Sequence, residues 1–303
     1  MINKKIIITG ALGQDGKILS KILIKKKYKV FGLIKSKKYN FRVKGVKYFR
    51  NDLSDKNKLL KLVKRIKPSV TIHLGSDNPS YKELKQRKDF LKKNFQSTKN
   101  LINALLKINL KTYFLFPNTS QIYLNNKQKI VNEKSIFSPT NNYANFRIKT
   151  LKFLEKVKNN NFSYTNIILF NHDSKYRHKK FLLPRLMKSI KKNNITFLNY
   201  IISQNVKADF SHAEDICFAI YKLIKSNKKI NKIILSSGKC TKVNDIIKYV
   251  IKKNKININI NFNISNKSSK CLIGNNKYAK KILNWLPKKN IFIAASEFFN
   301  YLK

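Results

Sequence analysis

Residues 6–16 read IIITGALGQDG, and this stretch decides the fold. An apolar, β-branched run opens it and predicts a buried strand, and residues 18–23 continue with apolar side chains at helical spacing. Between the two stand three glycines, Gly10, Gly13 and Gly16. Glycines at this spacing let the chain turn tightly, bring its backbone close to a pyrophosphate and pack a helix against the strand. The stretch therefore predicts a dinucleotide-binding turn with the anion at the helix N-terminus.

The rest of the first half alternates strand and helix patterns, as a doubly wound parallel sheet requires. Further strands are expected at residues 29–34, 46–49, 70–74, 112–116 and 167–170. We therefore predict an α/β fold, with a Rossmann-type doubly wound parallel sheet and a smaller C-terminal α/β domain. Residues 1–170 would form the cofactor-binding domain, to which the chain returns at about 206–240. Residues 171–303 would mainly form the substrate-binding domain.

The chain is strongly basic, with 66 lysines and arginines against 14 acidic residues and a net charge of +52. Such a charge often indicates nucleic-acid binding. Here lysine occurs in every segment, and no RRM, helix-turn-helix or zinc-finger signature accompanies it. We therefore expect a lysine-coated surface that attracts anionic ligands, nucleotide sugars among them, and no dedicated nucleic-acid face.

The ends and the cysteines of the chain indicate its compartment. Residues 1–5 lead directly into the first strand, and no apolar stretch is long enough for a signal peptide or a membrane span. Cys217, Cys240 and Cys271 are widely spaced, with no CxxC pair and no nearby histidine cluster. This pattern predicts neither a disulfide framework nor a metal site. We therefore expect a cytoplasmic protein with three reduced thiols.

The end of the second strand bears on the choice of cofactor. An NAD site usually has Asp or Glu there for the ribose hydroxyls, whereas this chain has Lys35, Lys37 and Lys38. Because the extra phosphate of NADP needs a cation, these lysines favour NADP. The alternative reading is that they are ordinary surface lysines, which leaves NAD open.

Two polar segments follow the expected fifth strand. Residues 118–123 read NTSQIY, and residues 138–147 read SPTNNYANFR and open a helix. Thr119 and Tyr143 would then meet at the carboxyl ends of the parallel strands, where α/β sheets bind their ligands.

Together with these two segments, five further strings carry a resemblance: TGALGQDG (9–16), NDLSD (51–55), LFNHDS (169–174), DFSHAEDI (209–216) and LIGNNKYAKKILNW (272–285). With them the chain resembles the GDP-mannose 4,6-dehydratases, which are extended short-chain dehydrogenases/reductases. The strings span almost the whole chain and stand in the order and separation of that family. The resemblance implies a lyase that binds NADP and a nucleotide diphospho-sugar and converts GDP-mannose to GDP-4-keto-6-deoxymannose.

The resemblance also implies roles for individual residues. Tyr143 would take the proton of the sugar C4 hydroxyl, assisted by Thr119. A tyrosine hydroxyl is a poor base at neutral pH unless a nearby cation favours the phenolate. The family has lysine for this purpose, where this chain has Arg147. The family also has a glutamate that moves the C5 proton, where this chain has Gln121.

For the ligands, the resemblance implies two sets of contacts. The cofactor would contact Gly10, Gly13, Gln14, Asp15, Gly16, Lys35, Asp52, Leu53 and Leu74. The sugar nucleotide would contact Asn171, Arg177 and Arg185. His212 is instead expected to be a structural, hydrogen-bonding histidine. Related enzymes pair through the helices expected at about 94–106 and 142–157, so a homodimer or homotetramer is expected.

Gln121 and Arg147 leave three functions open. The first is a GDP-mannose 4,6-dehydratase-like enzyme. The second is a nucleotide-sugar reductase or epimerase on the same scaffold, for which Gln121 presents no difficulty because no water has to leave. The third is a protein that binds a nucleotide sugar or a nucleic acid without catalysis.

Overall fold

The computed structural model describes residues 4–35, 42–76, 89–157, 159–226, 228, 230–262 and 270–302. Its largest feature is a seven-stranded sheet in the order β10-β7-β5-β4-β1-β2-β3. The strands are β1 (Lys5–Thr9), β2 (Lys29–Ile34), β3 (Lys47–Arg50), β4 (Val70–His73), β5 (Thr112–Thr119), β7 (Phe162–Leu169) and β10 (Lys232–Leu235). The pairs of β1 with β2 and β4, of β2 with β3, and of β4 with β5 are parallel. This is the strand order of a Rossmann sheet, with the switch point between β1 and β4.

The predicted fold class is confirmed, and the predicted strands agree with the sheet. The second strand has the expected bounds, whereas β7 begins at Phe162, before the expected 167, and β5 continues to Thr119. Lys37 and Lys38 lie outside the described residues.

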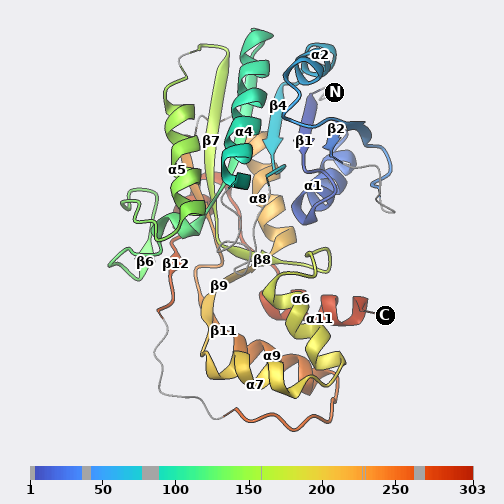
Figure 1. Cartoon of the computed structure of the whole chain (residues 1–303), viewed down its shortest axis with the longest axis vertical. Coiled ribbons are helices and arrows are strands. Elements are labelled where there is room, and N and C mark those ends of the chain that lie inside the picture. Colours follow the sequence, from blue (N-terminus) through green and yellow to red (C-terminus); the bar gives the residue numbers. More distant parts are fainter. Residues whose placement is uncertain are drawn as a thin grey trace. The chain divides into compact units, whose positions relative to one another are not determined.

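Helices cover both faces of this sheet (Figure 1). Helices α2 (Lys56–Ile66), α4 (Asp89–Lys107) and α5 (Asn142–Glu155) share one hydrophobic cluster with Ile7 and with Phe114 and Phe116 of β5. Ile6 and Ile8 alternate with Ile7 along β1, so they point to the opposite face. Helix α1 (Gln14–Lys25), whose buried residues are outside that cluster, contacts β1 and β2 there.

The chain forms two compact units. The first consists of Met1–Asn125, Phe137–Ile168 and Ile220–Ile233, and the second of Asn126–Ile136, Leu169–Ala219 and Ile234–Lys303. The second unit thus includes parts of the ranges expected for the first, namely residues 126–136, 169–170, 206–219 and 234–240.

The second unit has two small sheets. One has the order β11-β9-β8, from β8 (Asn171–Asp173), β9 (Lys207–His212) and β11 (Cys240–Lys242), and the other pairs β6 (Ile130–Val131) with β12 (Ile273–Gly274). Its helices are α6 (Leu182–Lys191), α7 (Ile195–Ser203), the start of α8 (Ala213–Ser226), α9 (Val243–Lys253), α10 (Lys277–Leu283) and α11 (Ile291–Tyr301). Buried residues of α6, α7, α9 and α11 form its core.

The expectation of three reduced thiols was wrong for one pair. Cys240 and Cys271 form a disulfide, with their Cα atoms 6.2 Å apart, and Cys217 is a free, buried cysteine. Both halves of the pair belong to segments that hydrogen-bond to Asp209, which brings them together although 31 positions separate them. A pairing made by tertiary contacts leaves no local spacing signature in the sequence.

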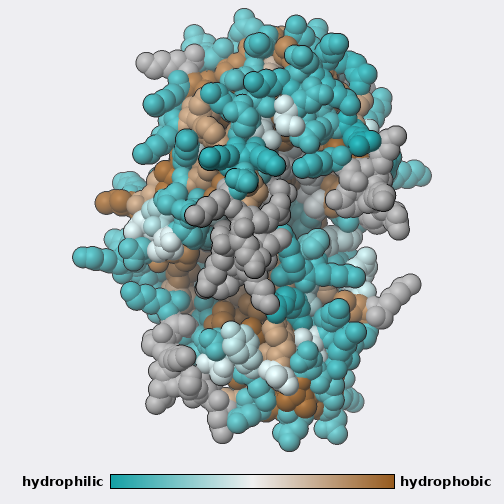
Figure 2. Space-filling model, in the orientation of Figure 1, coloured by the Kyte–Doolittle hydropathy of each residue, from teal (hydrophilic) through white to brown (hydrophobic). Residues whose placement is uncertain are grey.

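Among the described helices, none is long and apolar enough to cross a membrane. Hydrophilic residues are spread over the face drawn in Figure 2, as the even distribution of lysine in the sequence leads one to expect.

Candidate functional site

The glycine turn closes on itself and on the end of β4. Gly10 has a φ of +64°, and a Cβ there would lie 2.8 Å from the carbonyl oxygen of Leu74. A Cβ at Gly16 would lie 2.5 Å from the carbonyl oxygen of Gly10. At Gly13 a Cβ would meet only that same oxygen, at 3.2 Å, among the described residues. Gly10 and Gly16 are therefore required by packing, whereas a Cβ at Gly13 would make one tight contact with a backbone oxygen and otherwise face open space among the described residues.

The same glycine begins helix α1. Gly13 is its N-cap, and no side chain caps the helix. Gln14 and Asp15 follow in the first turn, where the Gln14 amide donates to the Asp15 carboxylate at 3.1 Å. An uncapped helix N-terminus beside open space is suited to an anion, which fits the pyrophosphate expected from the sequence.

Beneath this turn, a chain of hydrogen bonds runs through the buried His73. The Gly75 N–H donates to Thr9 Oγ1 (2.8 Å), which lies 2.9 Å from His73 Nδ1. On the other side, His73 Nε2 lies 2.9 Å from Thr98 Oγ1, which donates to the Asn94 carbonyl (2.8 Å). Because Thr98 uses its hydrogen there, His73 Nε2 carries the ring proton and Nδ1 accepts from Thr9.

This chain of bonds keeps His73 neutral. A second ring proton would have no acceptor except Thr9 Oγ1, which would then lose the acceptor for its own hydrogen. Burial and, to a smaller extent, the charge of Arg147 lower the pKa of His73 to about 3. The histidine thus joins β1, β4 and α4 at the carboxyl edge of the sheet without adding a charge.

The end of β2 carries a cation beside an anion. The pKa of Asp52 is lowered mainly by the hydrogen bond from the backbone N–H of Ser54. Lys35 is exposed, and its charge contributes to the same shift. The Asp52 carboxylate accepts from that N–H at 3.0 Å and from Ser54 Oγ at 2.9 Å. Leu53, the next residue, is buried, and its carbonyl accepts from Asn100 at 3.0 Å.

Asn141 ties the polar segment after β5 to helix α5. Thr119 ends β5 and caps the short 3₁₀ helix η1 (Ser120–Tyr123), where its Oγ1 accepts from the Gln121 N–H at 3.3 Å. Gln121 Oε1 accepts from Asn141 Nδ2 at 3.0 Å. Asn141 is the N-cap of α5, and its own Oδ1 accepts from the Ala144 N–H at 2.9 Å.

Tyr143 and Arg147 lie one turn apart on α5, and both are buried. The guanidinium carbon of Arg147 lies 4.3 Å from the centre of the Phe116 ring, and its Nη1 donates to Ser76 Oγ at 3.4 Å. Burial lowers the pKa of Arg147, and its interaction with Tyr143 opposes that effect. The structure thus joins Gln121 to the start of α5 through Asn141, and places Arg147 against Phe116 of β5 and Ser76 just beyond β4.

In the second unit, the three predicted substrate contacts differ in how far they are already engaged. Asn171 is exposed on β8, and its amide donates to the Asp209 carbonyl at 3.5 Å. Arg177 forms an ion pair with Asp173 at 2.9 Å and stacks on Phe181. Arg185 is exposed on α6, with its guanidinium carbon 4.6 Å from the centre of the Phe197 ring.

Sequence reasoning missed the role of Asp209. Its fully buried carboxylate accepts hydrogen bonds from Ser237 N (2.8 Å), Ser237 Oγ (2.6 Å), Gly238 N (3.1 Å) and Gly274 N (3.2 Å). Burial raises the pKa of Asp209, and these four bonds oppose the rise. The motif DFSHAEDI was the signal available, but only the fold shows which loops this aspartate joins.

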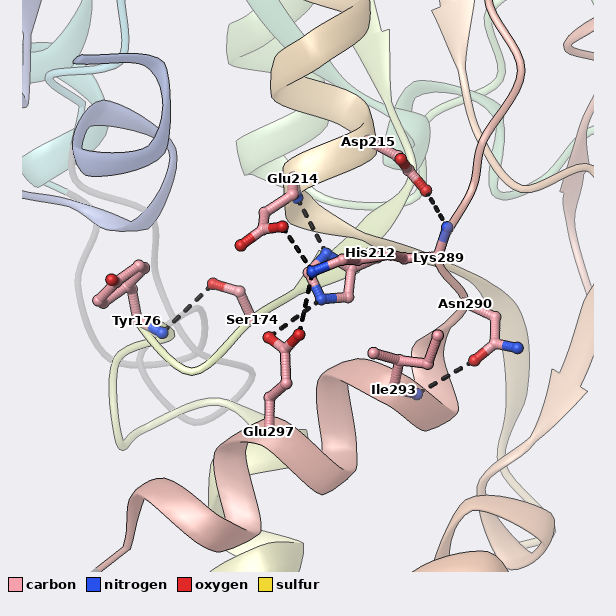
Figure 3. Close-up of polar contacts among 9 residues, drawn as sticks. All are labelled: Ser174, Tyr176, His212, Glu214, Asp215, Lys289, Asn290, Ile293 and Glu297. Atoms are coloured by element: carbon pink, nitrogen blue, oxygen red, sulfur yellow. Dashed lines mark hydrogen bonds and ion pairs between the residues drawn. The ribbon is translucent and has the colours of Figure 1, made fainter. Parts of the chain in front are cut away.

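His212 is held in a polar network at the C-terminal end of the second unit (Figure 3). Its Nδ1 accepts from the Glu214 N–H at 3.1 Å, so its Nε2 donates to Glu297 at 3.3 Å. Lys289 bridges Glu214 (2.7 Å) and Glu297 (3.1 Å), and its N–H donates to Asp215 at 2.6 Å. Both ring nitrogens are therefore used in fixing α11 to β9 and α8, which is a structural arrangement.

A cavity of about 230 Å³ in the second unit is lined by Lys179, Pro184, Lys188, Lys191, Lys192, Phe298 and Leu302. None of the residues predicted for the site is among them.

The comparisons with known proteins identify the family of the chain. A sequence model of the GDP-mannose 4,6 dehydratase family matches residues 7–293. The GDP-mannose 4,6 dehydratase of Drosophila melanogaster is 23% identical over 269 residues, which cover 82% of this chain and 68% of that protein. The human GDP-mannose 4,6 dehydratase is also 23% identical, with coverage of 80% and 70%.

Among solved structures, this chain resembles epimerases at low identity. The UDP-glucose 4-epimerase of Thermotoga maritima, solved with UDP-glucose, gives a TM-score of 0.84 at 16% identity, with 98% of each chain covered. The enzyme WbmH of Bordetella bronchiseptica, solved with NAD+, gives a TM-score of 0.80 at 14% identity, again with 98% of each chain covered. At these identities the likenesses show a shared fold and nothing more. Because the family match spans nearly the whole chain, the protein belongs to the GDP-mannose 4,6-dehydratase family.

Proposed function

We propose that this protein is an NADP-dependent enzyme that modifies a nucleotide diphospho-sugar in the manner of a GDP-mannose 4,6-dehydratase. One observation carries the proposal. The hydrogen bond of Asn141 to Gln121, and the position of Arg147 on Phe116, fasten α5 to the end of β5 at two points. These contacts would hold Thr119 and Tyr143 at the carboxyl edge of the sheet, the edge at which the glycine turn is suited to a dinucleotide.

The cofactor residues fit a nicotinamide dinucleotide. The open space at Gly13 and the uncapped start of α1 suit the pyrophosphate. Lys35 supports NADP, because a cation at the end of β2 can bind the extra phosphate. The negative charge of Asp52 interacts with Lys35 and weakens the attraction of this lysine for a phosphate, so NAD remains the alternative. When bound, the nicotinamide ring supplies reversible hydride transfer.

The chain's own residues would then handle the proton of the reacting hydroxyl. Tyr143 would accept it from the sugar C4 hydroxyl, and Thr119 would hydrogen-bond the same oxygen. Arg147, one turn along the helix, supplies the positive charge that favours the phenolate.

Gln121 decides how far the reaction proceeds. Loss of water across C5 and C6 requires a group that removes the C5 proton and assists the departing hydroxyl. An amide cannot exchange a proton in that way, and Asn141 already occupies its oxygen. General acid–base catalysis contributes about a hundredfold to ten-thousandfold, so we expect slow dehydration with hydride transfer retained.

The second unit would hold the sugar nucleotide. Arg185 is the exposed guanidinium best placed for bidentate contact with a diphosphate, because Arg177 is already paired with Asp173. Asn171 would contact the sugar. GDP-mannose is the first substrate to test, since the family's named members act on it. We also propose a homodimer or homotetramer formed through α4 and α5, and a cytoplasmic location.

Two measurements test the proposal. Equilibrium titration should give tighter binding of NADP than of NAD, and Lys35→Glu should reverse the preference. Mixing the NADP-loaded protein with GDP-mannose should produce reduced nicotinamide absorbance in a single turnover, and Tyr143→Phe should abolish it. Normal turnover by Tyr143→Phe, or failure of the natural protein to bind either dinucleotide, would overturn the proposal.

A reductase or epimerase of a nucleotide sugar is the second candidate, and Gln121 is the observation that favours it. Neither reaction removes water, so an amide at this position is no obstacle. The candidate predicts NADPH-dependent reduction of a 4-keto sugar nucleotide, with no loss of water from GDP-mannose. If the protein bound both ligands but transferred no hydride, a non-catalytic binding role would remain.

A further inference from the structure

We propose that Phe116 and Ser76 are positioning residues that form a seat for the Arg147 guanidinium, so that the site is specific for arginine. The proposal rests on the proposed function. Because the family usually has lysine at this position, Arg147→Lys would be expected to preserve activity; we expect it instead to lower the rate of hydride transfer.

The shape of the seat fits a guanidinium. Phe116 is fully buried on β5, and its ring centre lies 4.3 Å from the guanidinium carbon. Ser76, just beyond β4, accepts from Nη1 at 3.4 Å. A planar guanidinium can stack on an aromatic face and donate sideways at the same time, whereas a compact ammonium cannot do both.

Burial of the cation points in the same direction. Arg147 is only 6% exposed, and burial lowers its pKa. Among the described residues, two titratable groups face it: Tyr143, which favours its charge, and His73, which the surrounding hydrogen bonds keep neutral. The pKa of a guanidinium is normally so far above neutral pH that the group keeps its charge even when it is buried. A buried lysine loses its proton more readily.

The seat also leaves donor capacity for a ligand. Arg147 Nε is buried and has no hydrogen-bond partner among the described residues. Buried donors are usually paired, so one without a partner among the residues that the structure describes can bind an acceptor on a ligand. A hydroxyl of the cofactor's ribose is the chemistry that fits, which makes cofactor affinity a readout independent of turnover.

The chain contains a matched control for Phe116. Phe114 lies two residues earlier on the same strand, points to the same face, belongs to the same hydrophobic cluster and is also fully buried. Its ring lies against His73 and not on the arginine. Phe114→Leu therefore reports what a cavity in this core does without the loss of a stacked cation.

The experiment compares Arg147→Lys, Phe116→Leu, the double variant, Phe116→Tyr and Phe114→Leu. For each, NADP affinity is measured by calorimetry, the hydride-transfer rate by single turnover, and the KM for the sugar nucleotide by steady-state rates. We expect Arg147→Lys and Phe116→Leu each to lower the hydride-transfer rate about tenfold and to weaken NADP binding, with little change in KM. Phe116→Tyr should restore both properties, because it restores the aromatic face.

The coupling between the two positions decides the result. In the Arg147→Lys background, Phe116→Leu should add less than about a twofold effect, since the stacked partner is already gone. The proposal is overturned if Arg147→Lys binds NADP and transfers hydride as well as the natural protein, or if Phe116→Leu and Phe114→Leu have equal effects. If no variant and no natural protein transfers hydride, the proposed function fails, and NADP affinity still decides whether the seat exists.

Discussion

Acidification should destabilise this protein through His73, by an amount that follows from its surroundings. His73 is 1% exposed and its pKa in the folded protein is about 3, against 6.5 for a free histidine. Between these values the unfolded chain binds a proton that the folded protein does not, so the stability that neutral His73 contributes is present above pH 6.5 and lost on acidification. The loss is about 1.4 kcal/mol per pH unit, or about 2.7 kcal/mol at pH 4.5.

The assay is urea unfolding of the natural protein and of His73→Asn at several pH values between 7.5 and 4.5. Asparagine keeps a donor and an acceptor but does not titrate, and the other histidines cancel in the difference. The natural protein should be more stable at pH 7.5, and its advantage should shrink by about 2.7 kcal/mol at pH 4.5. A difference that stays constant over this range would refute the neutral, hydrogen-bonded His73 described above.

Three further outcomes are expected. Asp209→Ala removes the buried carboxylate that accepts four hydrogen bonds, so the free energy of unfolding should fall by about 3 kcal/mol; a fall below about 1 kcal/mol would contradict the arrangement. Cys240→Ser should lower the free energy of unfolding by about 3 to 4 kcal/mol under oxidising conditions and have little effect in excess dithiothreitol. Cys217→Ser is the control for a cysteine outside the disulfide. Equal losses in both conditions would argue against the disulfide. Gly13→Ala should weaken NADP binding at least tenfold in calorimetry while the melting temperature changes little, and unchanged affinity would exclude the turn as the phosphate site.

The sequence predicted best those features that depend on local pattern. The run before Gly10 is apolar and β-branched, and the glycines follow directly. Because these local signals all indicate the same strand-turn-helix unit, strand, turn and helix could be placed from the residues alone. The polar segments around Thr119 and Tyr143 could be placed as well, because parallel strands deliver their carboxyl ends to one edge.

Features that depend on tertiary contacts were beyond sequence reasoning. The tautomer of His73 follows from Thr9 and Thr98, which come from different elements and have no shared spacing. The four donors to Asp209 come from residues 237–238 and from β12, which meet only in the folded chain, and the disulfide forms beside them. The stacking of Arg147 on Phe116 likewise appears only once α5 lies on the sheet.

The central claim is that the site keeps its hydride-transfer residues, and that Gln121 limits the loss of water. Mass spectrometry of GDP-mannose incubated with NADP and either the natural protein or Gln121→Glu tests it most directly. The account predicts a product lighter by one water that forms at least a hundredfold faster with Gln121→Glu than with the natural protein. Equal rates of water loss with both proteins, or no water loss with either, would contradict it.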